Sequence, residues 1–175
     1  ILSVGVGSTA IVPRAFGAND KAAMLHATGQ SFALSIILGL GMTATATLLG
    51  HYVLHFFTPS DEVLNPARQY LIAYSFMLIP FSFTAIANAA FRAIGDSKTP
   101  LYIVSVMTAI NVAGDFLTVI YGWPIPNLGV LGIAYAALLA STVGAILAII
   151  AISHSPLKDS LRTIYPIDRN EIVRI

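Results

Sequence analysis

An apolar run of 21 residues, 101–121 (LYIVSVMTAINVAGDFLTVIY), limits the architectures open to this chain. A helix of that length measures about 30 Å, the thickness of the hydrocarbon core of a bilayer. The run holds one charged residue, Asp115, and a carboxylate in hydrocarbon costs roughly 3 kcal/mol or more, so it usually faces a polar cavity. Asn111 precedes it by four residues, on the same helical face. We therefore predict a membrane-spanning helix with Asp115 and Asn111 as a functional pair.

The composition extends this prediction to the whole chain. Hydrophobic residues make up 57% of its 175 residues and charged residues 10%, proportions that a domain with a solvated surface does not easily reach. Further long apolar blocks cover residues 1–16, 33–57, 67–92 and 129–153. Because these blocks are continuous rather than alternating, they indicate helices. The predicted fold class is an all-α integral membrane protein, a helical bundle.

Polar segments between the blocks predict loops. FGANDKAA at 16–23 supplies Asn19 and Asp20 for a turn and a helix cap, and TPSDEVLNP at 58–66 indicates an aqueous loop around Asp61, Glu62 and Pro66. FRAIGDSKTP at 91–100 precedes the helix of Asp115. YGWPIPNLG at 121–129 is typical of an interfacial turn, with Trp123 among the lipid headgroups.

The charges predict how the bundle crosses the membrane. Eight of the nine Lys and Arg residues lie in the first loop, in the third loop or in the tail, and only Arg68 lies on the other side. The positive-inside rule places the basic side in the cytoplasm. Asp115 then lies in the outer half of a multi-pass plasma-membrane protein, about 21 Å from the inner end of its helix. The net charge of +1 gives no indication of a nucleic-acid partner.

Three patterns concern helix packing. Pro80 lacks a backbone N–H, so we expect it to bend the helix of block 67–92. Thr43, Thr45 and Thr47 can donate to carbonyls of their own helix, which makes them structural residues. The block 129–153 carries small residues at every fourth position, a pattern that favours close packing against another helix: Gly132, Ala136, Ala140, Gly144 and Ala148.

The chain resembles the multidrug and toxic compound extrusion (MATE) transporters. AIVPRAFGAND, QYLIAYSFMLIPF, FRAIGDSKTPLYI, NVAGDFLTVIYG and GVLGIAYA carry this resemblance in order and spacing. It implies an incomplete six-helix lobe of a twelve-helix transporter. Residues 1–154 would be helices two to six of the amino-terminal lobe, and residues 155–175 a cytoplasmic linker toward the seventh helix. The first helix and the second lobe, which would complete the transporter, are expected to be missing.

The resemblance also bears on the coupling ion. Asn111 and Asp115 match the Asn-x-x-x-Asp pair of the family's cation site, whose partner carboxylate usually lies on the first helix. The sixth helix of the family often has threonine where this chain has Ala137, although Ser141 and Thr142 follow one turn later. This departure favours H⁺ over Na⁺ as the coupling ion.

The expected function is secondary-active multidrug efflux, in which a cationic or amphipathic drug or toxic metabolite leaves in exchange for H⁺ or Na⁺. The chain has no GxxxxGK[ST] loop for a nucleotide, so an ion gradient would supply the energy. Besides Asp115 and Asn111, the residues expected to line the cavity are Asn88, Tyr74, Tyr135 and Thr142.

Three alternatives stay open. A lipid-linked saccharide flippase of the same superfamily would be expected to carry Arg or Lys at membrane depth, whereas the predicted spans have such residues only at their ends, namely Arg14, Arg68 and Arg92. A membrane scaffold without transport activity would leave Asp115 unexplained. An enzyme would need a nucleophile with a base or a complete metal site, whereas His51 and His55 fit an interfacial belt better. We expect no enzyme activity, no metal and no cofactor.

Overall fold

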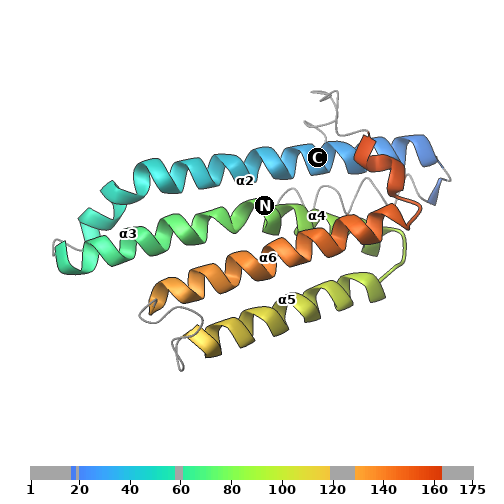
Figure 1. Ribbon diagram of the computed structural model, residues 1–175. Helices are drawn as coiled ribbons and strands as arrows, with labels where there is room; N and C mark the ends of the chain where they lie inside the picture. The colour runs from blue at the N-terminus through green and yellow to red at the C-terminus, as the bar shows by residue number, and fades with distance from the viewer. Residues whose placement is uncertain (1–16, 19, 58–60, 119–128, 163–175) are drawn as a thin grey trace.

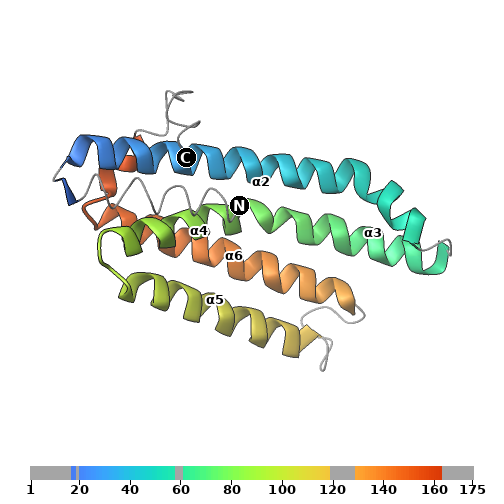
Figure 2. The same cartoon turned by 180° about the vertical axis from the view of Figure 1, so that it is seen from behind.

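The computed structural model describes residues 17–18, 20–57, 61–118 and 129–162. Within these ranges it has no strand, and its helices confirm the all-α fold class. They lie side by side with their long axes roughly parallel, and α2 and α5 form opposite edges (Figures 1 and 2). The elements are, in order, α2 (Lys21–Phe57), α3 (Asp61–Phe76), α4 (Leu78–Ala93), α5 (Lys98–Phe116), α6 (Val130–Ser153) and the 3-10 helix η2 (Lys158–Arg162). The predicted helix at 1–16, Trp123 and the tail beyond 162 lie outside the described residues.

Helix α2 begins at Lys21, well before the apolar block that starts at residue 33. The backbone N–H of Ala23 donates to the Asp20 carboxylate at 3.0 Å, so Asp20 caps the helix as expected from its loop. Apolar composition marks the part of a helix that suits hydrocarbon, whereas a cap marks where the helix begins. The first turns of α2 are polar but buried, with Thr28, Gln30 and Ser31 fully covered by neighbouring elements.

The prediction of an aqueous loop around residues 61–66 was wrong. Asp61, Glu62 and Pro66 belong to the first turns of α3. Acidic residues suit the N-terminal end of a helix, where the macrodipole is positive, so a polar segment of this kind can start a helix as readily as form a loop.

The block 67–92 forms parts of two helices, α3 and α4, that follow one another and are separated at Met77 (Figure 2). Pro80 cannot donate to the carbonyl of Phe76, four residues before it. The helix is therefore interrupted one turn ahead of the proline, at Met77. We call this interruption the α3–α4 break.

Among the described residues, three stretches are long and apolar enough to cross a membrane: Ala22–Gly50, Val63–Ala93 and Val130–Ser153. Helix α5 carries Lys98, Asn111 and Asp115, which lower its apolar character. The predicted span 101–121 begins inside α5 and ends beyond the described residues, so its passage through the membrane stays a prediction.

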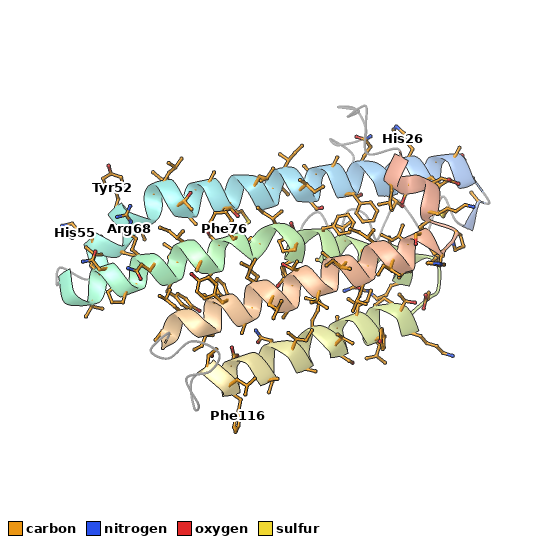
Figure 3. The ribbon with its side chains drawn as sticks, viewed as in Figure 1. His26, Tyr52, His55, Arg68, Phe76 and Phe116 are labelled. Atoms are coloured by element: carbon orange, nitrogen blue, oxygen red, sulfur yellow. The ribbon has the colours of Figure 1, made fainter. Side chains whose placement is uncertain are left out.

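The basic residues separate by position in the bundle. One end joins the start of α2, the end of α4, the start of α5 and the end of α6, and carries Arg92, Lys98 and Lys158. Arg68 and His55 lie at the other end, far from His26 near the start of α2 (Figure 3). This separation agrees with the charge asymmetry of the sequence.

The apolar core lies toward the basic end. Phe32 of α2 stacks on Phe83 of α4 with ring centroids 4.7 Å apart. Leu157, just after α6, is fully buried in the same cluster, so the segment that follows the last span packs back on the bundle. The cluster also contains Met24, Ala27, Ile86, Ala87, Ala90, Phe91, Ile103, Ala148 and Ile152.

The prediction that the small-residue stripe of α6 faces another helix is confirmed. All five stripe residues are buried, and α6 packs along α5. A Cβ on Gly114 of α5 would lie 2.6 Å from the Cβ of Ala136, and one on Gly132 would lie 2.5 Å from Thr118. At these two contacts the helices approach so closely that a larger side chain at Gly114 or Gly132 would not fit without a shift.

Candidate functional site

A pocket of about 360 Å³ opens between α3, α4, α5 and α6. We call it the inner pocket. Its wall combines aromatic rings and thioethers with a few oxygen-bearing groups, a lining typical of small-molecule sites. The lining residues are Tyr70, Tyr74, Met77, Phe81, Met107, Thr108, Asn111, Ile133, Ala137, Ala140 and Ser141.

Of the pair predicted from α5, one residue lines this pocket and the other, Asp115, does not. Asn111 lines it, and Asp115 follows one helical turn later on the same face. The carboxyl of Asp115 is half-buried, and its Oδ1 has no hydrogen-bond partner among the described residues. A buried oxygen of this kind costs free energy unless a proton, a cation or a donor from elsewhere meets it.

Tyr70 is a site residue that the sequence analysis missed. Its ring stacks on that of Tyr74, with centroids 5.5 Å apart, and both rings line the inner pocket. The signal was available, because Tyr70, Tyr74, Met77 and Phe81 recur at three- and four-residue spacing on one face.

The other predicted cavity residues are distributed over three places. Asn88 is only 6% exposed and does not line the inner pocket, but its Oδ1 also has no partner among the described residues. Tyr135 lines a second pocket of about 440 Å³ between α3 and α6, together with Gln69 and Phe76. Thr142 is exposed and donates to the carbonyl of Leu138 in its own helix at 2.7 Å.

Helix α6 brings Ser141, rather than Thr142, into the inner pocket. The Ser141 hydroxyl donates to the carbonyl of Ala137 at 2.8 Å, which leaves its oxygen lone pairs available as an acceptor. Ala137 itself supplies only a methyl group and its backbone. Carboxylate, amide and hydroxyl oxygens are hard donors that suit a proton or a hard cation better than a soft metal.

A protein-family model described as MatE matches residues 1–117. The probable multidrug resistance proteins YoeA of Bacillus subtilis and NorM of Thermotoga maritima are each 27% identical to the chain, over 80% and 83% of its length. The chain spans 30% and 31% of the length of these two relatives. A solved inward-facing multidrug resistance MATE transporter matches 98% of the chain with a TM-score of 0.84 and 23% identity. The chain covers 38% of that structure, and this likeness shows the fold.

A more distant relative is named for a different activity. The lipid II flippase MurJ of Thermosipho africanus is 24% identical over 131 residues, which are 75% of this chain and 26% of MurJ. The sequence is therefore similar to parts of proteins that carry different functional names.

Proposed function

Since this chain belongs to the MatE family, we propose that the complete transporter containing it exports cationic or amphipathic compounds across the plasma membrane in exchange for H⁺ or Na⁺. Members of this family are membrane transporters, and the part of the chain that the structure describes carries three candidate spans. The complete protein would add a first helix with a partner carboxylate and a second lobe. We propose transport without an enzymatic step.

The observation that carries this proposal is the Asp115 carboxyl beside the inner pocket. One of its oxygens is buried without a partner among the described residues, and Asn111 lies one turn away in the pocket wall. Intramembrane carboxylates are expensive and usually serve ion or substrate pathways.

Competition for the Asp115 carboxyl would couple the inward flow of the ion to the export of the compound. When Asp115 holds a proton or a sodium ion, its charge is neutralised and its attraction for a cationic compound is lost. When the ion leaves, the carboxylate again favours a positive charge in the pocket. Two ligands that compete in this way lower each other's affinity by the same factor, which is the thermodynamic requirement for exchange.

Asp115→Asn tests the proposal because it keeps the size and hydrogen-bonding capacity of the side chain and removes its charge. We expect the full-length variant to fold and to lose ion-gradient-driven efflux of a cationic dye from proteoliposomes. Asp159→Asn in η2 makes the same change of charge outside the pocket and should export like the parent. Parental efflux by Asp115→Asn at matched protein content would overturn the proposal.

The relation to MurJ supports a second candidate, transport of a lipid-linked saccharide. None of the residues that line the inner pocket is basic, so the described part of the site offers no cation to an anionic diphosphate. A lipid-linked saccharide assay in the same vesicles separates the candidates. Saccharide movement without dye efflux would favour the flippase.

A further inference from the structure

Helix α2 contacts the α3–α4 break through three residues at four-residue spacing, Ser35, Gly39 and Thr43. We call them the contact face of α2. The Thr43 hydroxyl donates to the carbonyl of Ser75 at 2.8 Å. The Ser82 hydroxyl of α4 is shared between two carbonyls, that of Ser35 in α2 and that of Ile79 in its own helix, each at 2.9 Å. Two hydroxyl groups therefore connect α2 to the chain on both sides of Met77.

Gly39 lies between these two hydrogen bonds and allows the backbones to approach. A Cβ on Gly39 would lie 2.7 Å from the Ser82 Oγ, 3.0 Å from the Cα of Ile79 and 3.2 Å from the carbonyl oxygen of Leu78. The first two residues of α4 thus rest directly on the α2 backbone. No side chain larger than hydrogen fits at this position without a shift of α4.

Pro80 disturbs the backbone hydrogen bonds at the break, and α2 supplies a donor beside it. A proline in a helix removes one backbone donor, and in an apolar surrounding the freed carbonyls need partners from neighbouring helices. Pro80 leaves the carbonyl of Phe76 without its helical donor, and the carbonyl of the preceding residue, Ser75, accepts from Thr43. The four residues of the two hydrogen bonds are all buried, so water does not compete for them: Ser35, Thr43, Ser75 and Ser82.

The expectation that Thr43 bonds to its own helix was wrong. The other two threonines of this stretch, Thr45 and Thr47, do bond to their own helix. The Thr45 hydroxyl donates to the carbonyl of Gly41 at 2.8 Å, and that of Thr47 donates to the carbonyls of Thr43 and Ala44. Local bonding is thus available to a threonine in this part of α2. Thr43 instead reaches α3, because the break presents a carbonyl to it.

The same break borders the inner pocket. Tyr74 precedes Met77 and Phe81 follows it, and all three line the pocket, as does Tyr70 one turn further back in α3. The angle between α3 and α4 therefore sets the distance between the rings at the two sides of the break.

We propose that Thr43 and Ser82 are positioning residues that fix the α3–α4 break against α2 and so hold the aromatic wall of the inner pocket. Hydrogen bonds on both sides of Met77 make the bend a fixed joint, and α2, α3 and α4 move as one body. The effect on transport rests on the proposed function. The effect on the bend does not.

Spin labels at Asn65→Cys and Ser97→Cys test the joint directly. Both residues are exposed, one near the start of α3 and one just beyond α4, so their separation reports the bend. In the full-length protein we expect a narrow distance distribution. Thr43→Val combined with Ser82→Ala should broaden it, and Thr43→Val alone should do so to a smaller degree. Thr43→Ser keeps the hydroxyl and should restore the narrow distribution.

Thr45→Val is the matched control, since it removes a hydroxyl from the same helix without touching the break. It should leave the distance distribution unchanged. A distribution for Thr43→Val with Ser82→Ala that is as narrow as the parental one would overturn the proposal, as would equal broadening by Thr45→Val.

Transport kinetics give a second measurement. The paired variant should raise the apparent KM for the dye by about tenfold, the factor expected from the loss of one or two buried hydrogen bonds, while its maximal rate stays close to parental. A fall in maximal rate with unchanged KM would contradict a positioning role. A parent that exports no dye would overturn the proposed function only, because the spin-label distances still decide whether the joint is fixed.

Discussion

Asp96 stabilises the start of α5 through one carboxylate. Its Oδ1 accepts the backbone N–H groups of Lys98 and Thr99, each at 3.0 Å, and its Oδ2 accepts the Thr99 hydroxyl at 2.6 Å. Gly95 precedes it with a positive φ of 86°, a conformation that glycine adopts without steric cost. The Thr99 hydroxyl and then the backbone N–H groups hold the pKa of Asp96 below its ordinary value.

The cap should therefore make stability depend on pH. Because the folded-state pKa is lowered, the carboxylate contributes stability above the unfolded pKa of about 3.9. This contribution disappears as the pH falls through the folded pKa. We expect Asp96→Ala to lower the unfolding free energy by about 1 kcal/mol near neutral pH and to leave it little changed in acid.

Thermal unfolding of the full-length protein in detergent measures this effect. The measurement is repeated at a series of pH values, from pH 7 down to the lowest pH at which the protein stays soluble. Thr99→Val removes one of the three bonds and should give an intermediate loss. Equal destabilisation by Asp96→Ala across the whole pH range would contradict the cap as its cause.

Asn111→Ala should weaken transport less than Asp115→Asn. The amide of Asn111 offers a neutral oxygen to the pocket, whereas Asp115 supplies the charge that an ion or a cationic compound neutralises. We expect a higher apparent KM for the coupling ion with efflux retained. Dye efflux measured at a series of sodium concentrations and pH values checks this, and complete loss of efflux in Asn111→Ala would give the amide a larger role than proposed.

Local residue patterns predicted some side chains and not others. The Asp20 cap depends on spacing along one helix, so the sequence was sufficient to find it. The Asn111–Asp115 pair comes from the same kind of spacing, and its role stays a prediction. The bond from Thr43 to Ser75 and the place of Tyr70 depend on how separate helices meet. Such contacts are set by tertiary packing, which no local pattern specifies.

At the scale of the element, the contact between α5 and α6 depends on small side chains. We expect Ala136→Leu to destabilise the full-length protein by about 1 to 3 kcal/mol, because overpacking at a close contact forces the backbones apart. Gly114 lies directly opposite, so no flexible side chain is present there to move away.

The measurement is the melting temperature in detergent at matched concentration. Leu139→Met is the control, since Leu139 is 58% exposed on the same helix and the change conserves its volume. Ala136→Leu should melt at a lower temperature than this control. Equal melting temperatures would mean that the stripe does not limit the distance between α5 and α6.

Apolar blocks predicted the existence of the helices better than their bounds. The block 33–57 became the later part of a helix of 37 residues, because polar turns at its start are buried by neighbouring elements. Pro80 predicted a bend, and the bend lies at Met77, where the helical pattern of backbone hydrogen bonds is interrupted. Composition reports the surroundings of a segment, whereas helix ends depend on caps and on backbone hydrogen bonds.

At the scale of the whole molecule, the exposed apolar side chains indicate which faces meet lipid. The C-terminal half of α2 exposes large side chains, among them Leu48 at 72%, Tyr52 at 72% and Phe56 at 84%. A soluble protein rarely leaves such a continuous patch open to water. Sequence composition alone predicted this class of protein, because a bundle with so few charges has no polar surface with which to cover its helices.

Orientation in the membrane is the last prediction, and it follows from the antiparallel arrangement of the described helices. The loop after α4 lies at the basic end of the bundle, and the start of α3 lies at the end that carries Arg68. If the basic end is cytoplasmic, Ser97→Cys should react with a membrane-impermeant maleimide only after cells are permeabilised, and Asn65→Cys should react in intact cells. Both residues are exposed and this chain has no cysteine of its own, so a full-length protein cleared of other cysteines gives an unambiguous signal. Labelling of Ser97→Cys from outside intact cells would reverse the orientation and place Asp115 in the inner half of the membrane.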